Sequence, residues 1–150
     1  MALKIPPFLV YMIFGGLMYL LSMFLPVGYF DFFGRFILIK ILIVLGMVIC
    51  ITAIVQFFRN KTTMDPSDPS KTTVLVTRGI YNYTRNPMYF SMLLFLLAWG
   101  LWLGNAFNTI LAAGFVAYMN RFQIIPEETA LKMRFGKAYV QYLAMVRRWF

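Results

Sequence analysis

Two polar clusters of this chain could carry chemistry, because each adjoins a long apolar run. The first cluster, residues 79–89, contains Arg85 and Asn86, and the second, residues 126–128, contains two adjacent glutamates. Arg85 can present a planar fork of donors to a carboxylate or a phosphate. Glutamate carboxylates accept hydrogen bonds from the paired hydroxyls of a ribose or from an ammonium group. Charged groups are costly to place beside an apolar bundle, so we interpret the clusters as one functional site.

The first cluster also places aromatic rings next to these charges. Tyr81, Tyr83 and Tyr89 supply hydroxyls and ring faces, and an aromatic-rich pocket suits a sulfonium cation. The combined set fits binding of a zwitterionic, ribose-bearing cofactor. Structural roles fit the same residues: Arg85 could anchor a lipid headgroup, the glutamates could complement a helix dipole, and the tyrosines could form an interfacial belt.

The elements that must position these residues are membrane helices. The chain has 150 residues, 61% of them hydrophobic and 13% charged, and a bilayer core about 30 Å thick requires runs of about 20 apolar residues. We find four such runs, at 8–25, 36–58, 88–103 and 106–125. Only Gly104-Asn105 joins the last two, so a helical hairpin would bring both polar clusters to one membrane face. No small-residue cleavage site follows the first run, so we expect no cleaved signal peptide.

The placement of charge predicts the orientation. The chain carries 14 Lys+Arg against 5 Asp+Glu, a net charge of +9. With four spans and a cytoplasmic N-terminus, every basic residue except Arg35 and Lys40 lies on the cytoplasmic side, as the positive-inside rule requires. Both termini are therefore expected in the cytoplasm. Anionic lipid headgroups account for the basicity, and we expect no nucleic-acid partner.

The chain contains no histidine and a single cysteine, Cys50, inside the second run. This composition excludes a disulfide framework, a thiolate metal cluster, His-based zinc or haem sites and an imidazole base. We therefore expect no metal.

The tail after the fourth run has helical periodicity. Its apolar residues recur every three or four positions, at Leu131, Phe135, Ala138, Tyr139, Tyr142, Val146 and Trp149. This pattern predicts one amphipathic cytoplasmic helix, or two short ones broken at Gly136, serving as a membrane-surface anchor or as a lid over the site. The expected fold is an all-α membrane bundle of about four transmembrane helices with this tail. It forms a single domain, 1–150, with a two-span part at 1–58 and a cofactor-binding core at 59–150.

Three sequence segments together resemble a known enzyme family. They are Leu-Val-Thr-Arg-Gly-Ile-Tyr at 75–81, Arg-Asn-Pro-Met-Tyr at 85–89, and Glu127-Glu128 followed by tail residues that end in Arg148-Trp149. The chain resembles the isoprenylcysteine carboxyl methyltransferase and phospholipid methyltransferase family, and most of all its short bacterial members. The resemblance implies a helical bundle whose C-terminal half binds S-adenosylmethionine without a Rossmann domain, and S-adenosylhomocysteine would be the product. It also implies a location in the bacterial inner membrane.

The resemblance implies specific site residues. The cofactor would be bound by Val76, Gly79, Tyr81, Arg85, Asn86, Pro87, Tyr89, Glu127 and Glu128. Arg121 matches an arginine suited to hold an acceptor carboxylate, and we expect Arg121 and Glu128 to be the catalytic residues. Eukaryotic members usually carry histidine at the position of Asn86, which weakens any transfer of the prenylcysteine substrate.

The expected reaction is in-line displacement, with the acceptor atom about 3–3.5 Å from the methyl carbon and water excluded. A carboxylate, amine or thiol on a lipophilic acceptor needs little help from a base, whereas a hydroxyl would need Glu127, Glu128 or a tyrosine to take its proton. The acceptor's identity and the oligomeric state stay open.

Two other functions fit parts of the sequence. Sterol reductases, which use NADPH, resemble the family in their C-terminal halves, although those chains are much longer. A non-enzymatic membrane or transport protein is the second alternative. A transporter should carry an ionisable residue deep in a span, but Lys40 lies only about one turn into the second run and can snorkel.

Overall fold

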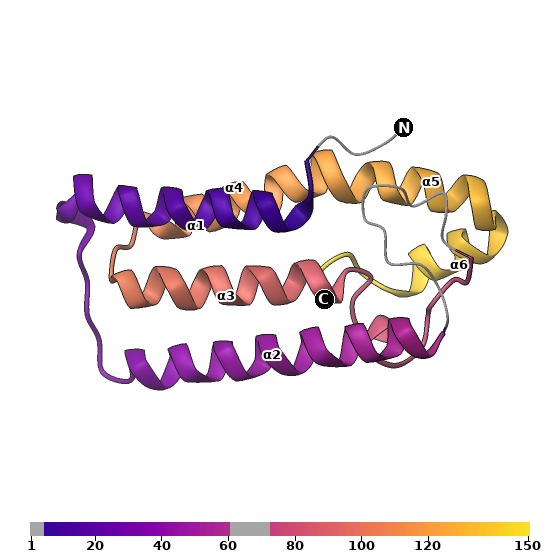
Figure 1. The fold of residues 1–150 in the computed structure, drawn as a ribbon, viewed down its shortest axis with the longest axis horizontal. Coiled ribbons are helices and arrows are strands. Elements are labelled where there is room, and N and C mark those ends of the chain that lie inside the picture. Colours follow the sequence, from indigo (N-terminus) through magenta and orange to yellow (C-terminus); the bar gives the residue numbers. More distant parts are fainter. Residues whose placement is uncertain (1–4, 61–72) are drawn as a thin grey trace.

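The computed structural model describes residues 5–60 and 73–150 as a helical bundle (Figure 1). Lys4 and nearly all of the polar loop at 60–73 lie outside the described residues. Within them the helices are α1 (Pro7–Phe24), α2 (Arg35–Arg59), α3 (Pro87–Leu103), α4 (Asn108–Met119), α5 (Ile125–Phe135) and α6 (Lys137–Met145). The described residues form no β-strand beyond one isolated bridge between Tyr29 and Asn105. The all-α prediction is confirmed.

Helix α3 lies at the centre of the bundle. It packs against α2 on one side and against α1 and α4 on the other (Figure 1). The α1–α2 and α3–α4 connections lie at one end of the bundle and α5 and α6 at the other, while the C-terminus lies beside the start of α3. The start of α3 and the end of α4 therefore share one end, as expected of the hairpin.

Two helices, α1 with 18 residues and α2 with 25, are long and apolar enough to cross a membrane by length and composition. Helix α3 is apolar but has 17 residues, about 25 Å at 1.5 Å per residue. The predicted run 106–125 forms α4, with 12 residues, and a π-helical turn, η4 (Asn120–Ile124). The structure therefore supports two candidate spans and two shorter helices.

Proline and glycine set the helix boundaries that matter for the site. Pro87 occupies the first turn of α3, where a missing N–H costs nothing. Pro126 lies just after the π-helical turn, within a helical backbone that continues from α4 into α5. Gly104 ends α3 in the left-handed region with φ 68°, as glycine commonly does. Gly136, with φ 54° and ψ −127°, separates α5 from α6. The tail is thus two short helices.

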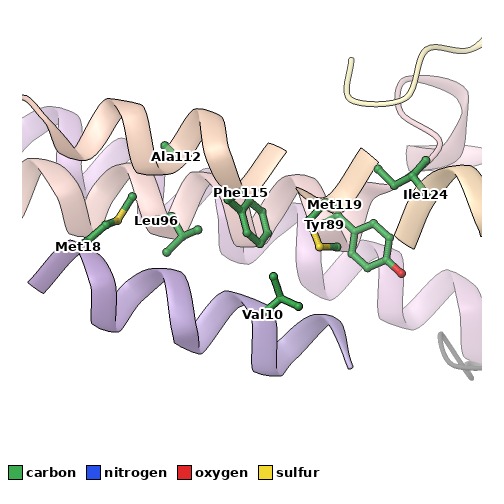
Figure 2. Close-up of a cluster of buried hydrophobic side chains, with 8 residues drawn as sticks. All are labelled: Val10, Met18, Tyr89, Leu96, Ala112, Phe115, Met119 and Ile124. Atoms are coloured by element: carbon green, nitrogen blue, oxygen red, sulfur yellow. The ribbon is translucent and has the colours of Figure 1, made fainter. Parts of the chain in front are cut away.

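Two apolar clusters hold the bundle together. The first joins α1, α3, α4 and η4 through Val10, Met18, Tyr89, Leu96, Ala112, Phe115, Met119 and Ile124 (Figure 2). The second lies at the end that carries the tail, where Tyr139, Tyr142 and Val146 pack on Tyr81 of the short helix η3 (Gly79–Asn82). The second cluster fixes the polar segment 79–86 against α6.

Candidate functional site

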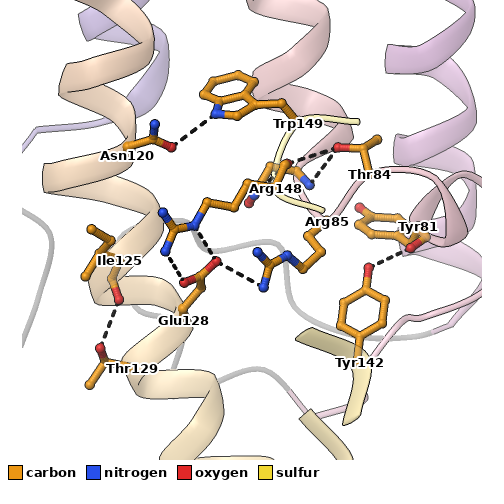
Figure 3. A network of polar contacts seen from close by, with 11 residues as sticks. Tyr81, Thr84, Arg85, Asn120, Ile125, Glu128, Thr129, Tyr142, Arg148 and Trp149 are labelled. Atoms are coloured by element: carbon orange, nitrogen blue, oxygen red, sulfur yellow. Dashed lines mark hydrogen bonds and ion pairs between the residues drawn. The ribbon is translucent and has the colours of Figure 1, made fainter. Parts of the chain in front are cut away.

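The centre of the candidate site is an ion cluster around Glu128 (Figure 3). The Arg148 guanidinium donates from Nε to Glu128 Oε1 at 2.9 Å and from Nη2 to Oε2 at 2.8 Å. Arg85 Nη1 lies 3.3 Å from Glu128 Oε1. Glu128 is buried, with 8% of its surface exposed. Two guanidinium groups therefore surround one buried carboxylate, and the contact with Glu128 raises the pKa of Arg148.

The three charged side chains of the cluster come from three separate segments of the chain. Arg85 lies in the turn between η3 and α3, where Asn86 is held out of the helix (φ −129°) by the proline that follows it. Glu128 is in the first turn of α5, and Arg148 follows α6. The structure thus brings Arg85 and Glu128 together, as the hairpin predicts.

Residues 146–150, here called the C-terminal strap, cross this cluster. The backbone N–H of Arg85 donates to the Arg147 carbonyl at 3.0 Å. The Thr84 hydroxyl and the Asn86 amide both donate to the Arg148 carbonyl at 3.1 Å. The indole N–H of Trp149 reaches Asn120 Oδ1 at 3.1 Å, and the Phe150 ring packs on Phe90. The strap therefore ties the turn before α3 to η4.

Glu127 has different neighbours from Glu128. The Tyr89 hydroxyl of α3 donates a hydrogen bond to its carboxylate. Among the described residues no lysine or arginine forms an ion pair with Glu127. Burial raises the pKa of Glu127 to about 8; the neighbouring Glu128 charge adds to the rise, and the Tyr89 hydrogen bond opposes it. At neutral pH this carboxyl is therefore mostly protonated.

Buried polar atoms without partners remain beside these acids. Tyr81 is 6% exposed, yet its hydroxyl makes no hydrogen bond within the part of the chain that the structure describes, and neither does the buried Nε of Arg85. Tyr81 is held in place by Tyr142, whose hydroxyl donates to the Tyr81 carbonyl at 2.7 Å. Burial raises the pKa of the Tyr81 hydroxyl, and the nearby Glu127 charge adds to the rise. Buried polar groups normally have partners, so these atoms need explaining.

Other sequence-predicted residues have structural contacts. Gly79, with φ 66°, packs so closely on Gln56 that an added Cβ would lie 1.7 Å from its amide nitrogen. Gln56 also accepts from the Ile80 N–H at 3.1 Å, docking η3 on α2. Val76 packs on the Tyr81 cluster, and Pro87 is fully buried at the start of α3.

Arg121 lies in η4, outside the Glu128 ion cluster. Its side chain is exposed, and its guanidinium carbon lies 5.8 Å from the centroid of the Phe122 ring. Gln123, two positions further on, is buried; its amide donates to the Ile5 carbonyl, and its Oε1 has no partner among residues 5–60 and 73–150. π-Helical turns are rare and often occur at functional sites.

Sequence reasoning missed three contributors to this site. It did not foresee the Arg148–Glu128 pair, the Asn120–Trp149 bond or the Gln56 contact. Arg148 and Trp149 end the third segment that resembles the family, so a charged residue there was a sign that the pair belongs to the site. Asn120 begins the segment 120–128 that also carries the family resemblance, so it had a signal as well. Gln56 had none, because its role depends on which helices pack together.

Comparison with known proteins shows the family. Residues 34–138 match the family model described as phospholipid methyltransferase. The chain belongs to the phospholipid methyltransferase family. The matched region contains Arg85, Glu127 and Glu128 and ends before the C-terminal strap.

Two relatives extend the comparison. An uncharacterized protein of Haemophilus influenzae is 50% identical over 62 residues, which are 41% of this chain and 98% of that protein. Protein-S-isoprenylcysteine O-methyltransferase of Schizosaccharomyces pombe is 33% identical over 98 residues, 65% of this chain. The match spans only 42% of the yeast protein. No solved structure matches this phospholipid methyltransferase family member.

Proposed function

We propose that this chain is an integral-membrane methyltransferase that uses S-adenosylmethionine to methylate a carboxylate, amine or thiol on a lipophilic acceptor. Membership of the phospholipid methyltransferase family supports the reaction class. One structural observation carries the proposal furthest. Among the described residues, the family-matched region contains a Glu127 carboxyl without a cationic partner, a Tyr81 hydroxyl without a hydrogen bond and an Arg85 guanidinium whose Nε is unbonded.

The unpaired groups suit the parts of this cofactor. Glu127 fits a cationic group, and the Tyr81 hydroxyl can bond to a ribose hydroxyl or a carboxylate. The free Nε of Arg85 suits the carboxylate of the amino-acid portion. Val76, Gly79, Asn86, Pro87, Tyr89 and Glu128 complete the proposed pocket, with Asn86 and Glu128 acting through the strap that they bind.

When bound, S-adenosylmethionine would supply a methyl group on a sulfonium: the electron pair of the acceptor would bond to the methyl carbon as the carbon–sulfur bond breaks, and the sulfur would leave as a neutral thioether. The residues of the chain position the two partners and exclude water. The C-terminal strap covers the ion cluster between the turn before α3 and η4, so it contributes to that exclusion. A carboxylate or thiolate acceptor gives up no proton in the transfer, so neither needs a base.

Arg121 is the proposed anchor for the acceptor. It is exposed and lies six positions before Glu127, on the same end of the bundle. Its guanidinium can therefore bind an anionic group at the membrane surface. We propose four spans, an inner-membrane location and cytoplasmic termini, which would place this site at the cytoplasmic face.

Calorimetric titration of the detergent-purified protein tests the proposal. S-adenosylhomocysteine is the ligand, because it lacks the transferable methyl group, and NADPH is the parallel ligand. Saturable binding of S-adenosylhomocysteine alone is expected. Binding of NADPH alone would move the protein to the reductases, and binding of neither would contradict the cofactor assignment.

A further inference from the structure

The two adjacent glutamates of the site are not equivalent. Arg148 binds both oxygens of Glu128, and Arg85 approaches Oε1 as well. Two positive charges against one negative charge leave no electrostatic reason for Glu128 to attract another cation. Its contacts also connect α5 to the strap and to the turn before α3. Glu128 is thus a structural ion-pair centre of the site.

No arginine or lysine among the described residues neutralises the Glu127 carboxylate as Arg85 and Arg148 neutralise that of Glu128. The partner of Glu127 is the neutral Tyr89 hydroxyl from α3. Three other titratable groups interact electrostatically with Glu127. They are Glu128 on its own helix, Tyr81 on η3 and Tyr139 on α6. None of these side chains carries a positive charge, and the nearby arginines are already bound to Glu128. Glu127 is half-buried as a whole residue, but its carboxyl is largely removed from water. A desolvated carboxyl without a cation beside it holds its proton until a cation arrives.

We propose that Glu127, and not Glu128, is the carboxylate that binds a cationic group of the ligand, and that it releases its proton to solvent as the cation binds. The inference rests on the proposed function, since it assumes a ligand with an ammonium or sulfonium group. The charges balance: a neutral carboxyl and a cation become an ion pair plus one free proton. The Tyr89 hydroxyl stays bonded to the ionised carboxylate, and the unpartnered Tyr81 hydroxyl lies in the same electrostatic neighbourhood.

Proton release can be counted by calorimetry in two buffers of different ionisation enthalpy at the same pH. With the pKa of Glu127 at about 8, the carboxyl is about nine-tenths protonated at pH 7 and about half protonated at pH 8. We expect release of about 0.9 proton per ligand at pH 7 and about 0.5 at pH 8. The dissociation constant should rise about tenfold from pH 7 to pH 6, because protons compete with the cation.

Comparing S-adenosylhomocysteine with S-adenosylmethionine shows whether Glu127 binds the ammonium or the sulfonium of the ligand. Both ligands carry the ammonium group, but only S-adenosylmethionine carries the sulfonium. Equal release with both ligands assigns the ammonium to Glu127, and release with S-adenosylmethionine alone assigns the sulfonium. If both ligands bind and neither causes proton release, the inference is overturned and the proposed function still stands.

Glu127→Gln is the decisive variant. It replaces a carboxyl that is mostly neutral at pH 7 with a neutral group of the same shape, so the fold should persist. We expect no proton release, at least tenfold weaker binding and a dissociation constant that is constant between pH 6 and pH 8. Asp31→Asn is the matched control: Asp31 lies in the connection between α1 and α2, far along the chain from the site, and the variant should release protons as the wild type does. Proton release by Glu127→Gln would overturn the inference, and failure of both ligands to bind the wild type would overturn it together with the proposed function.

Discussion

At the scale of single residues, the site is a set of charges whose surroundings decide their roles. Two neighbouring glutamates differ in partners: Glu128 is bound by arginines, and Glu127 by a tyrosine. The sequence shows both acids but not this difference, since Arg148 and Tyr89 lie 20 and 38 positions away. The residue types predicted that the charged side chains would lie close together. Which of them form ion pairs or hydrogen bonds depends on how the helices pack.

Tyr89→Phe tests the environment of Glu127. The Tyr89 hydrogen bond lowers the pKa of the Glu127 carboxyl, so its loss should raise that pKa further. The pH at which proton release on ligand binding falls to one half should move up, and binding at pH 7 should weaken several-fold. Calorimetry across pH measures both. Tyr83→Phe, at an exposed ring, is the control, and a downward shift in Tyr89→Phe would contradict the assignment.

Arg148→Ala tests the ion cluster. It removes two charge-assisted hydrogen bonds to a buried carboxylate, and such bonds contribute about 1.5–3 kcal/mol each, less where the arginine is partly exposed as here. The thermal midpoint in detergent should fall by several degrees, and S-adenosylhomocysteine should bind less tightly. Arg147→Ala changes an exposed side chain whose neighbour contact is through the backbone, so it should behave as the wild type. Equal stability of the two variants would show that the cluster contributes little.

At the scale of elements, glycine and proline predicted the boundaries well. Pro87, Gly104 and Gly136 each mark a helix end that the structure contains. The sequence did not predict the π-helical turn η4, because residues 120–124 lie inside a continuous apolar run. The prediction of a helix through Trp149 was wrong: Val146 and Trp149 continue the helical spacing, but α6 ends at Met145. Both η4 and the C-terminal strap are stabilised by long-range contacts, such as the bond between Trp149 and Asn120.

The backbone between α5 and α6 gives an element-scale prediction. Gly136 has positive φ, and no atom lies within 4 Å of where a Cβ would be added, so any cost of Gly136→Ala is backbone strain alone. We expect a loss of about 1–2 kcal/mol in the free energy of unfolding. Gly16→Ala, also in open space but within α1, should be neutral or slightly stabilising. Thermal unfolding of both variants measures the contrast, and equal midpoints would argue against the break at Gly136.

At the scale of the whole molecule, composition and hydropathy predicted an all-α bundle that carries its polar groups at one end. The structure contains helices at all four apolar runs, yet only α1 and α2 have the length and composition of a span. Hydropathy alone could not show that the α-helical part of the fourth run ends at Met119 and that a π-helical turn follows it. The positive-inside rule supplies an orientation that the fold by itself does not.

Cysteine labelling tests that orientation. In a Cys50→Ala background, Asp31→Cys lies between α1 and α2, and Met145→Cys lies exposed at the end of α6. A membrane-impermeant maleimide should label Asp31→Cys in cells with a permeabilised outer membrane. It should label Met145→Cys only after the inner membrane is opened. The reverse pattern would invert the proposed topology, and labelling of both before opening would contradict it.

Transfer of a labelled methyl group to lipid tests most directly whether this chain is a membrane methyltransferase. Membranes containing the wild-type chain are incubated with methyl-labelled S-adenosylmethionine, and the label in the lipid extract is compared with that from membranes containing Glu127→Gln. We expect more label in the lipid extract of the wild-type membranes than in that of the Glu127→Gln membranes. Protein that binds S-adenosylhomocysteine but transfers no more label than Glu127→Gln would contradict the proposed function.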